Sequence, residues 1–264
     1  MVDKLSKPID CFLADALTVN VYESEQDMAL AAAQIAQTYL IKTIASQGHA
    51  RIVFATGKSQ LIFLKNLINL GGVNWQKVTC FHLDEYLGLT PDHPGSLRHY
   101  LQQNLGKLFS AQQFHYIQGE ALEPLQECDR YTQLLQAAPI DLVLLGIGQN
   151  GHIAFNDPSV ANFQDPYTVK LVKLDEENRQ QQYQQGWFKN INDVPQYAFT
   201  LTIPTICQAR KIICLAPDQR KANIVKTMLT DTINPACPVS ILRRQPQATL
   251  FLDIHSASLL DNYS

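Results

Sequence analysis

The sequence predicts an α/β protein built on a largely parallel β-sheet. Strand-like and helix-like stretches alternate along the chain, a pattern typical of parallel strands connected by helices. The run DLVLL at 141–145 is almost continuously apolar, as expected of a central parallel strand that is covered on both faces. No internal repeat or linker interrupts the alternation. We therefore expect one domain that spans residues 1–264.

Short apolar or β-branched runs that end at turn residues predict the strands. The first is RIVFA, which ends at Thr56-Gly57. The predicted strands, in order, are 51–55, 78–83, 141–145, 168–174, 211–215 and 248–252.

Apolar residues at helical spacing predict the helices between these strands. The segment 24–46 is rich in alanine, and 123–138 has Pro124 near its first turn, where proline is tolerated. The other predicted helices are 59–70, 95–109 and 218–229. We interpret the glutamine-rich run RQQQYQQ at 179–185 as a polar helix face rather than a binding segment.

The composition narrows the possible partners and the location of the protein. Hydrophobic residues make up 46% of the chain, which is enough to bury a sizeable core. The net charge of −3 gives no general attraction for nucleic acid or anionic membranes. No apolar run reaches the roughly 18 residues of a membrane span, and no signal-peptide core is visible. Six scattered cysteines without a CxxC pair indicate reduced thiols. We therefore expect a cytoplasmic protein.

Ligands of open parallel sheets bind at the carboxyl ends of the strands, and three loops there carry polar residues. The first loop contains Gly57, Lys58 and Ser59. Backbone N–H groups at a helix start, together with the Ser59 hydroxyl, can hold a phosphate. The P-loop pattern GxxxxGK[ST] is absent. A plain turn with a serine cap is the alternative interpretation.

The second loop holds two adjacent carboxylates, Asp84 and Glu85, at the end of a hydrophobic strand. Neighbouring side chains on a strand point to opposite faces, so one carboxylate can face a pocket while the other pairs elsewhere. A carboxylate that is partly shielded from water can have a raised pKa and act as a proton-transfer base. The composition alone equally allows an acidic turn on the surface.

The third loop, GIGQNGHIAFNDP at 146–158, follows the strand expected to be central. It contains GxGxxG, but the helix-breaking run at 156–158 argues against a dinucleotide site. A catalytic loop fits better, because glycines allow close approach to a ligand and histidine suits acid–base chemistry near neutral pH. Asp157 is placed to fix the tautomer of His152. The other histidines lack metal-ligand spacing, so we predict no metal site.

Two long motifs carry a family resemblance. The sequence FHLDEYLGLTPDHPGSLRHYL at 81–101 resembles a signature of the glucosamine-6-phosphate deaminases, also called isomerases, and GIGQNGHIAFNDP resembles their second signature. The similarity extends over residues 52–253. The related 6-phosphogluconolactonases carry a DGHTASLFP-like loop and a DER-like strand end, whereas this chain has NGHIAFNDP and DEY.

The resemblance implies a modified open α/β sheet with helices on both faces, of the NagB/RpiA/CoA-transferase type, and no cofactor. The implied reaction opens the ring of glucosamine 6-phosphate, moves a proton from C2 to C1 and releases ammonia, leaving fructose 6-phosphate. By resemblance, Asp84 takes the C2 proton and His152 is the acid–base group of ring opening. Asn150 orients the histidine or the substrate, and Asp157 supports His152.

Asp157 departs from the family pattern, because the family usually has glutamate there. Aspartate is one methylene shorter, so its carboxylate must lie closer to His152 or reach it through water. Catalytic geometry is sensitive at about the 1 Å level, so the rate or the preferred sugar can differ. Galactosamine 6-phosphate is one alternative substrate, and a 6-phosphogluconolactonase-like activity or a non-catalytic sugar-phosphate sensor are other readings.

The phosphate site is implied less completely. Gly57, Lys58 and Ser59 align with the phosphate loop of the family, and Lys221 aligns with a phosphate-binding lysine. An insertion at 179–188 removes the match to the family's phosphate arginine, leaving Gly186 near that position and Arg179 as a substitute. No residues match the allosteric site of some members, so we expect no such regulation. The only expected partner is a small sugar phosphate, and the sequence leaves a homo-oligomer open.

Overall fold

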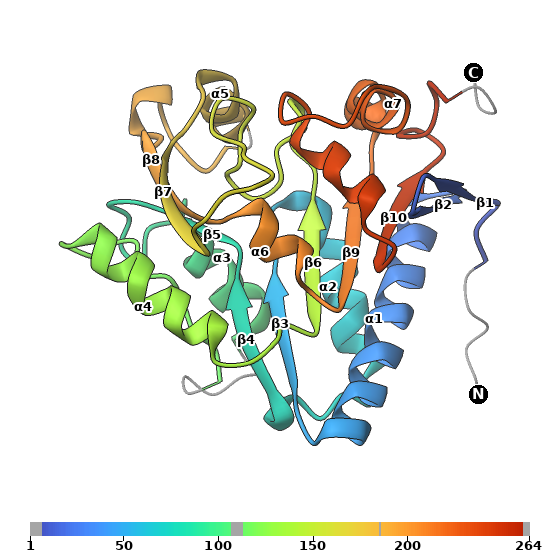
Figure 1. Ribbon diagram of the computed structural model, residues 1–264, viewed down its shortest axis with the longest axis horizontal. Helices are drawn as coiled ribbons and strands as arrows, with labels where there is room; N and C mark the ends of the chain where they lie inside the picture. The colour runs from blue at the N-terminus through green and yellow to red at the C-terminus, as the bar shows by residue number, and fades with distance from the viewer. Residues whose placement is uncertain (1–6, 107–112, 185, 261–264) are drawn as a thin grey trace.

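The computed structural model describes residues 7–106, 113–184 and 186–260, and a seven-stranded sheet lies at the centre of this part of the chain (Figure 1). The strand order is β1-β2-β10-β9-β6-β3-β4. All neighbouring pairs are parallel except β1 and β2, which form a hairpin. The strands are β1 (Asp10–Ala14), β2 (Leu17–Tyr22), β3 (Ala50–Phe54), β4 (Val78–His82), β6 (Leu142–Gly146), β9 (Lys211–Ala216) and β10 (Ala248–Asp253). The open parallel sheet predicted from the sequence is confirmed.

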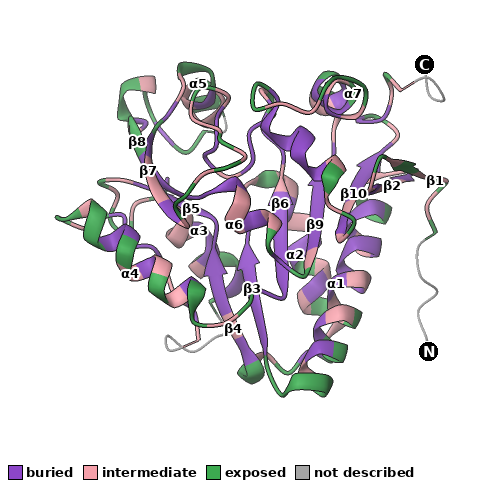
Figure 2. Ribbon diagram, viewed as in Figure 1, coloured by how far each residue is buried: buried purple, intermediate pink, exposed green. Residues whose placement is uncertain are grey.

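Helices cover both faces of this sheet because its strands are apolar on both sides. In β3, Ile52 and Phe54 belong to one core cluster and Val53 to the other. One face packs against α1 (Glu25–Gln47), α2 (Lys58–Leu70) and α3 (Leu97–Leu105). The other packs against α4 (Pro124–Gln136), α6 (Ile203–Cys207), α7 (Ala222–Thr230) and η4 (Pro238–Arg244). Figure 2 shows the central strands almost entirely buried.

The long helix α1 illustrates how local sequence sets these elements. Ser24 caps its start, with the Asp27 N–H donating to the Ser24 hydroxyl at 3.1 Å. The helix ends at Gly48, whose φ of 82° lies in the left-handed region that glycine tolerates. Alanines on the buried face let the helix approach the sheet closely, and they include Ala32, Ala33 and Ala36.

A second, antiparallel sheet projects from the carboxyl end of β4. Its order is β5-β8-β7, with β5 (Asp84–Tyr86), β8 (Tyr197–Leu201) and β7 (Val169–Lys173). β7 leads into α5 (Glu176–Gln184). Three short 3-10 helices complete the connections: η1 (Trp75–Lys77), η2 (Ile191–Asp193) and η3 (Gln219–Lys221). Among the described residues no helix is long and apolar enough to cross a membrane.

Each segment predicted to be a strand contains one in the structure. The segment 168–174 belongs to the small antiparallel sheet rather than to the parallel one. The strands β1, β2, β5 and β8 were not predicted. The predicted helix 95–109 is α3, and 107–109 lie outside the described residues. The predicted helix 218–229 starts as η3 before becoming α7. The six cysteines are all free thiols.

Candidate active site

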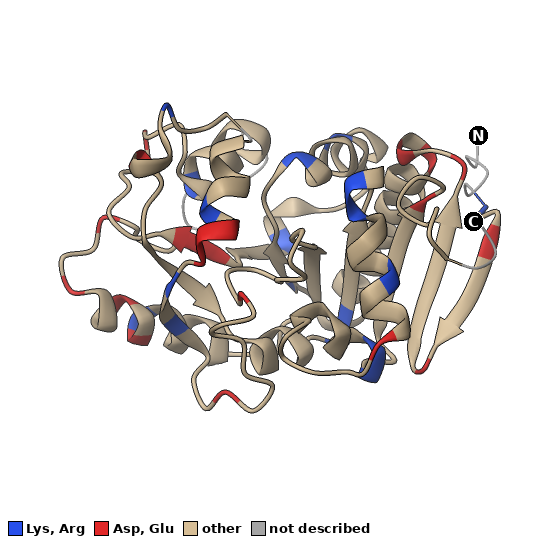
Figure 3. Ribbon diagram, turned by 90° about the horizontal axis from the view of Figure 1, so that it is seen from above, with Lys and Arg blue, Asp and Glu red and all other residues tan. Residues whose placement is uncertain are grey.

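A pocket lies at the carboxyl ends of β3, β4, β6 and β9, as expected for an open parallel sheet. Its volume of about 570 Å³ is within the usual range for small-molecule sites. The strand-end segments that line it are 55–59, 83–84, 146–149 and 217–218. On one side it is closed by side chains of α5. Figure 3 looks onto this end of the sheet and shows basic and acidic residues interspersed over the chain.

The two carboxylates of β5 have different environments, as the alternation of strand side chains predicts. Glu85 accepts hydrogen bonds from the Ser96 hydroxyl at 2.8 Å, from the Arg98 N–H at 2.7 Å and from the Leu97 N–H at 3.1 Å. Glu85 therefore holds the start of α3. Asp84 instead lines the pocket, although only 7% of it is exposed.

Asp84 is a carboxyl group in an environment that disfavours its charge. Burial, and secondarily the charge of neighbouring Glu85, raise the pKa of Asp84 to about 8. A group with a pKa near the working pH is well suited to exchange a proton in both directions. The predicted base is therefore both reachable from the pocket and electrostatically tuned.

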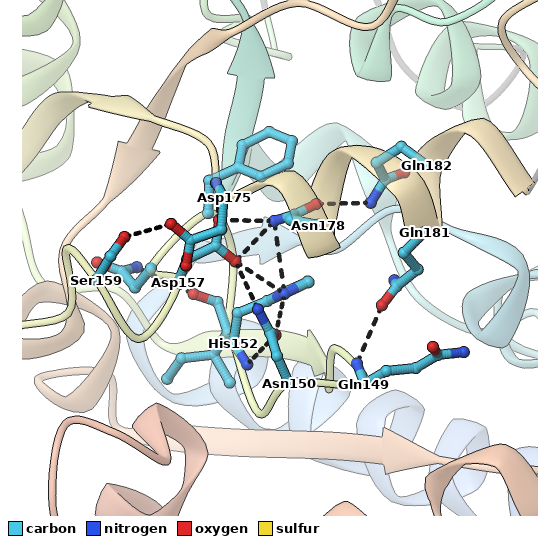
Figure 4. Close-up of polar contacts among 12 residues, drawn as sticks. Gln149, Asn150, His152, Asp157, Ser159, Asp175, Asn178, Gln181 and Gln182 are labelled. Atoms are coloured by element: carbon cyan, nitrogen blue, oxygen red, sulfur yellow. Dashed lines mark hydrogen bonds and ion pairs between the residues drawn. The ribbon is translucent and has the colours of Figure 1, made fainter. Parts of the chain in front are cut away.

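His152 lies on the loop after β6 and lines the same pocket, and its ring contacts are drawn in Figure 4. His152 Nδ1 is 2.7 Å from Asn150 Oδ1 and 3.1 Å from Asp157 Oδ1. The Asn150 amide nitrogen donates to Asp157 Oδ1 at 3.2 Å, so its oxygen faces the ring. With two oxygen acceptors beside it, Nδ1 carries the proton. Nε2 is then the ring atom available for acid–base chemistry.

The shorter side chain of Asp157 reaches the histidine directly. The carboxylate is completely buried, and its 3.1 Å contact with His152 needs no bridging water. Of the two arrangements expected for aspartate at this position, the structure therefore has the closer one. The loop is also tied to the small sheet, because the Phe155 N–H donates to Thr200 Oγ1 at 3.1 Å.

The pocket also has polar and cationic residues in its lining. α2 begins at Lys58 after Gly57, which has a φ of 106° and provides no side-chain cap. Ser59 lies inside the first turn, so a turn capped by this serine is not what the chain forms. Lys58 and Ser59 line the pocket, and so does Lys221, which lies just before α7. Burial, with a smaller effect from the charge of Arg220, lowers the pKa of Lys221 to about 8.

Comparison with known proteins accounts for this arrangement. The family described as glucosamine-6-phosphate isomerases/6-phosphogluconolactonase matches residues 23–251. The chain belongs to this family. One relative, a glucosamine-6-phosphate deaminase of Exiguobacterium sibiricum, is 38% identical to this chain over 192 residues, which cover 72% of this chain and 73% of the relative. Another, of Clostridium acetobutylicum, is 34% identical over 250 residues, covering 92% and 99%.

The fold of this chain is also similar to solved structures of glucosamine-6-phosphate deaminases and 6-phosphogluconolactonases. A monomeric glucosamine-6-phosphate deaminase of the NagB superfamily superposes with a TM-score of 0.85 at 30% identity, covering 91% of this chain and 99% of that one. A 6-phosphogluconolactonase of Thermotoga maritima gives a TM-score of 0.72 at 18% identity, covering 89% and 98%. The second likeness concerns the fold alone. The predicted NagB-type fold is confirmed.

Arg179, the predicted substitute for the family's phosphate arginine, does not lie with the other predicted site residues. Its guanidinium donates to the carbonyls of Ile191 at 3.0 Å and of Val194 at 3.1 Å, and it pairs with Glu176 at 2.8 Å. These contacts hold α5 against η2, and Arg179 does not line the pocket. Arg220, which was not among the predicted site residues, lines the pocket beside Lys221 and pairs with Asp218 at 2.9 Å. Its place next to Lys221 in the sequence was the available signal.

The glutamine-rich helix is only partly as predicted. It is polar, but one side of it faces the site rather than solvent. Gln181, Gln182 and Gln184 line the pocket, and the Gln149 N–H donates to Gln181 Oε1 at 3.0 Å. Trp187, just after the helix, also lines the pocket. α5 and Trp187 therefore form one wall of the site.

Gly148 leaves room for the histidine, and we expect Gly148→Ala to damage the site. A Cβ at this position would lie 2.2 Å from His152 Nδ1 and Cε1, far inside van der Waals contact. The ring must move away from Asp157, so kcat should fall at least about 10-fold, on the scale of misplaced catalytic groups. Steady-state kinetics would measure this, and circular dichroism would verify the fold. Unchanged kcat would contradict the geometry.

Proposed function

We infer that the chain is a glucosamine-6-phosphate deaminase, which converts glucosamine 6-phosphate and water to fructose 6-phosphate and ammonia. The observation that carries this proposal is that Asp84 and His152 line one pocket together with the start of α2 and the cation of Lys221. Relatives named glucosamine-6-phosphate deaminase, at 33–38% identity, support it. The activity is assigned to a single domain over residues 1–264, in the cytoplasm.

Ring opening is the step assigned to His152. Nε2 takes the proton of the C1 hydroxyl and returns a proton to the ring oxygen as the bond between C1 and that oxygen breaks. Asn150 and Asp157 keep the proton of the neutral ring on Nδ1, and the Asp157 carboxylate stabilises the imidazolium that forms. The product of this step is the open-chain aldehyde.

Asp84 carries out the next step. Its carboxylate takes the proton from C2 of the open chain while the ammonium group of the substrate gives a proton to the C1 aldehyde oxygen, which forms an enolamine. The proton held by Asp84 is then delivered to C1. This leaves a C2 imine, which water attacks to release ammonia and form the ketone. The ammonium group of the substrate, held near Asp84, favours the carboxylate form of this side chain. No redox change occurs, so the steps as written need no redox cofactor.

Phosphate binding is assigned to the start of α2 and to the lysines of the pocket. The first N–H groups of α2 after Gly57 and the Ser59 hydroxyl supply neutral donors, and Lys58 and Lys221 supply charge. Lys58 is exposed, whereas Lys221 is only partly so. Binding of the dianion favours the charged form of Lys221, which burial otherwise disfavours.

Lys221→Met is expected to raise the KM for glucosamine 6-phosphate about 10- to 100-fold, because a hydrogen bond to a charged group contributes about 1.5–3 kcal/mol. kcat should change much less, since the phosphate is remote from C1 and C2. Steady-state kinetics would separate the two effects. Lys226→Met is a matched control, because Lys226 is an exposed lysine on the following helix. A Lys221 variant with the KM of the wild type would remove this lysine from the phosphate site.

The direct test is an end-point assay of purified protein with glucosamine 6-phosphate and no added cofactor, reading ammonia and fructose 6-phosphate together. Equal amounts of both products are expected. Galactosamine 6-phosphate and 6-phosphogluconolactone are assayed in parallel, so that a shifted sugar preference or a lactonase would be recognised. Tight binding of the sugar phosphate without any product would identify a sensor and overturn the proposal.

A further inference from the structure

We propose that Asn178 of α5 is a positioning residue that holds Asp157 against His152 and thereby fixes the proton on His152 Nδ1; this rests on the function proposed above. Asn178 is the buried residue of a helix that is otherwise polar and accessible, with 1% of it exposed. Its amide nitrogen lies 2.9 Å from Asp157 Oδ1 and 3.1 Å from Oδ2. One side chain therefore contacts both oxygens of the carboxylate.

Asp157 needs such donors because it is fully buried. Burial alone raises the pKa of Asp157, but the hydrogen bond and charge of His152, the amide of Asn178 and the N–H of Asp175 together bring it below its ordinary value. The Asp175 N–H donates to Asp157 Oδ2 at 3.1 Å, at the turn that leads into α5. A buried carboxylate that loses a donor keeps the full cost of desolvation. Asn178 therefore helps Asp157 to remain an anion that can accept from His152.

The orientation of the Asn178 amide is set by a second contact. Its Oδ1 accepts from Gln182 Nε2 at 3.3 Å, one turn further along α5, so its nitrogen faces Asp157 (Figure 4). The nitrogen is 3.5 Å from His152 Nδ1, which is long for a hydrogen bond. The donor therefore serves the carboxylate rather than the ring, and the ring proton is left to face Asp157 and Asn150.

This arrangement connects a wall of the pocket to the acid–base group. Gln182 lines the pocket and also bonds Asn178, and Gln181 lines the pocket and bonds the backbone of the catalytic loop. α5 thus contacts the loop at two points one turn apart. The position of Asp157 beside the His152 ring then depends on α5 being docked.

The test compares Asn178→Ala and the isosteric Asn178→Asp with the wild type. Gln180→Ala is the control, since Gln180 is an exposed amide on the same helix. Both Asn178 variants should lose kcat at least about 10-fold with KM within about 2-fold, the aspartate more because two carboxylates then face each other. The acidic limb of kcat, which follows Asp84, should stay where it is in the wild type, so the loss falls on the height of the kcat profile and not on its position.

A second readout does not depend on turnover. The His152 Nδ1–H resonance, observed by NMR in protein labelled with nitrogen-15 at histidine, should be protected in the wild type and in Gln180→Ala. It should broaden or vanish in both Asn178 variants. An unchanged resonance in both Asn178 variants, or a raised KM with unchanged kcat, would overturn the proposal. If the wild type forms no ammonia, the proposed function fails, while this resonance still decides the role of Asn178. If Asn178→Ala does not fold, the isosteric aspartate variant decides it.

Discussion

Asp84→Asn is expected to lower kcat at least about 10²-fold, the scale of lost general-base catalysis. Asparagine keeps the shape of the side chain but cannot take a proton from C2. Exchange of the C2 hydrogen with deuterated solvent should be lost to the same extent as ammonia release. Asp92→Asn is the control, because Asp92 is exposed in the loop after β5. A folded Asp84→Asn protein with near-wild-type turnover would refute the assignment.

Asp84→Asn, which lowers activity, should raise the stability of the folded protein as the pH rises. The pKa of Asp84 is raised to about 8 in the folded protein, against about 4 in an unfolded chain. The folded state therefore favours the protonated acid, and the stability contributed by this preference is lost as the pH rises from about 4 through 8. Asparagine never ionises, so the variant does not lose this stability as the pH rises. The Tm difference between variant and wild type should grow in favour of the variant over this range, and a constant difference would contradict the raised pKa.

The pH profile of the wild type should follow the same group. The base acts as a carboxylate, so kcat/KM should rise as the pH approaches the free-enzyme pKa of about 8. Bound substrate carries an ammonium group that favours the carboxylate, so the corresponding limb of kcat should lie at lower pH. Initial rates across pH 5–9 would measure both limbs.

His152→Gln is the second substitution for which a large effect is expected. Glutamine can still form hydrogen bonds, but it cannot carry a proton between the C1 hydroxyl and the ring oxygen. kcat should fall about 10²- to 10⁴-fold, the usual contribution of acid–base catalysis, while KM changes little. His255→Gln serves as the control, because His255 is exposed. A raised KM with unchanged kcat would assign His152 to binding instead.

Local sequence predicted the parts of the site that depend on strand periodicity and loop chemistry. The opposite directions of Asp84 and Glu85 follow from the two-residue repeat of a strand, and the proximity of His152 to Asp157 follows from a tight glycine loop. The place of Arg179 outside the pocket was not predictable, because its acceptors are backbone carbonyls of 191 and 194, and a sequence does not show where carbonyls lie. Asn178 was missed because one asparagine in a polar run looks like its solvated neighbours until the helix is docked.

The fold was predictable to a similar degree. Strands buried on both faces are visible as apolar runs, and they became the parallel sheet. The small antiparallel sheet was missed because β5 is only three residues long and pairs with β8, more than a hundred positions away. Such a pairing depends on contacts that no short window contains.

The small sheet holds one group of site residues, and the large sheet holds another. Asp84 pairs with Thr200 across β5 and β8, and Thr200 also accepts from the loop that carries His152. The two groups proposed to transfer protons are therefore both attached to the small sheet, whereas Lys58 and Lys221 come from loops after β3 and β9 of the large sheet. Changes in those loops can alter how tightly the phosphate is held without disturbing the spacing of acid and base. Selection can thus diversify recognition in this lineage while the chemistry is inherited intact.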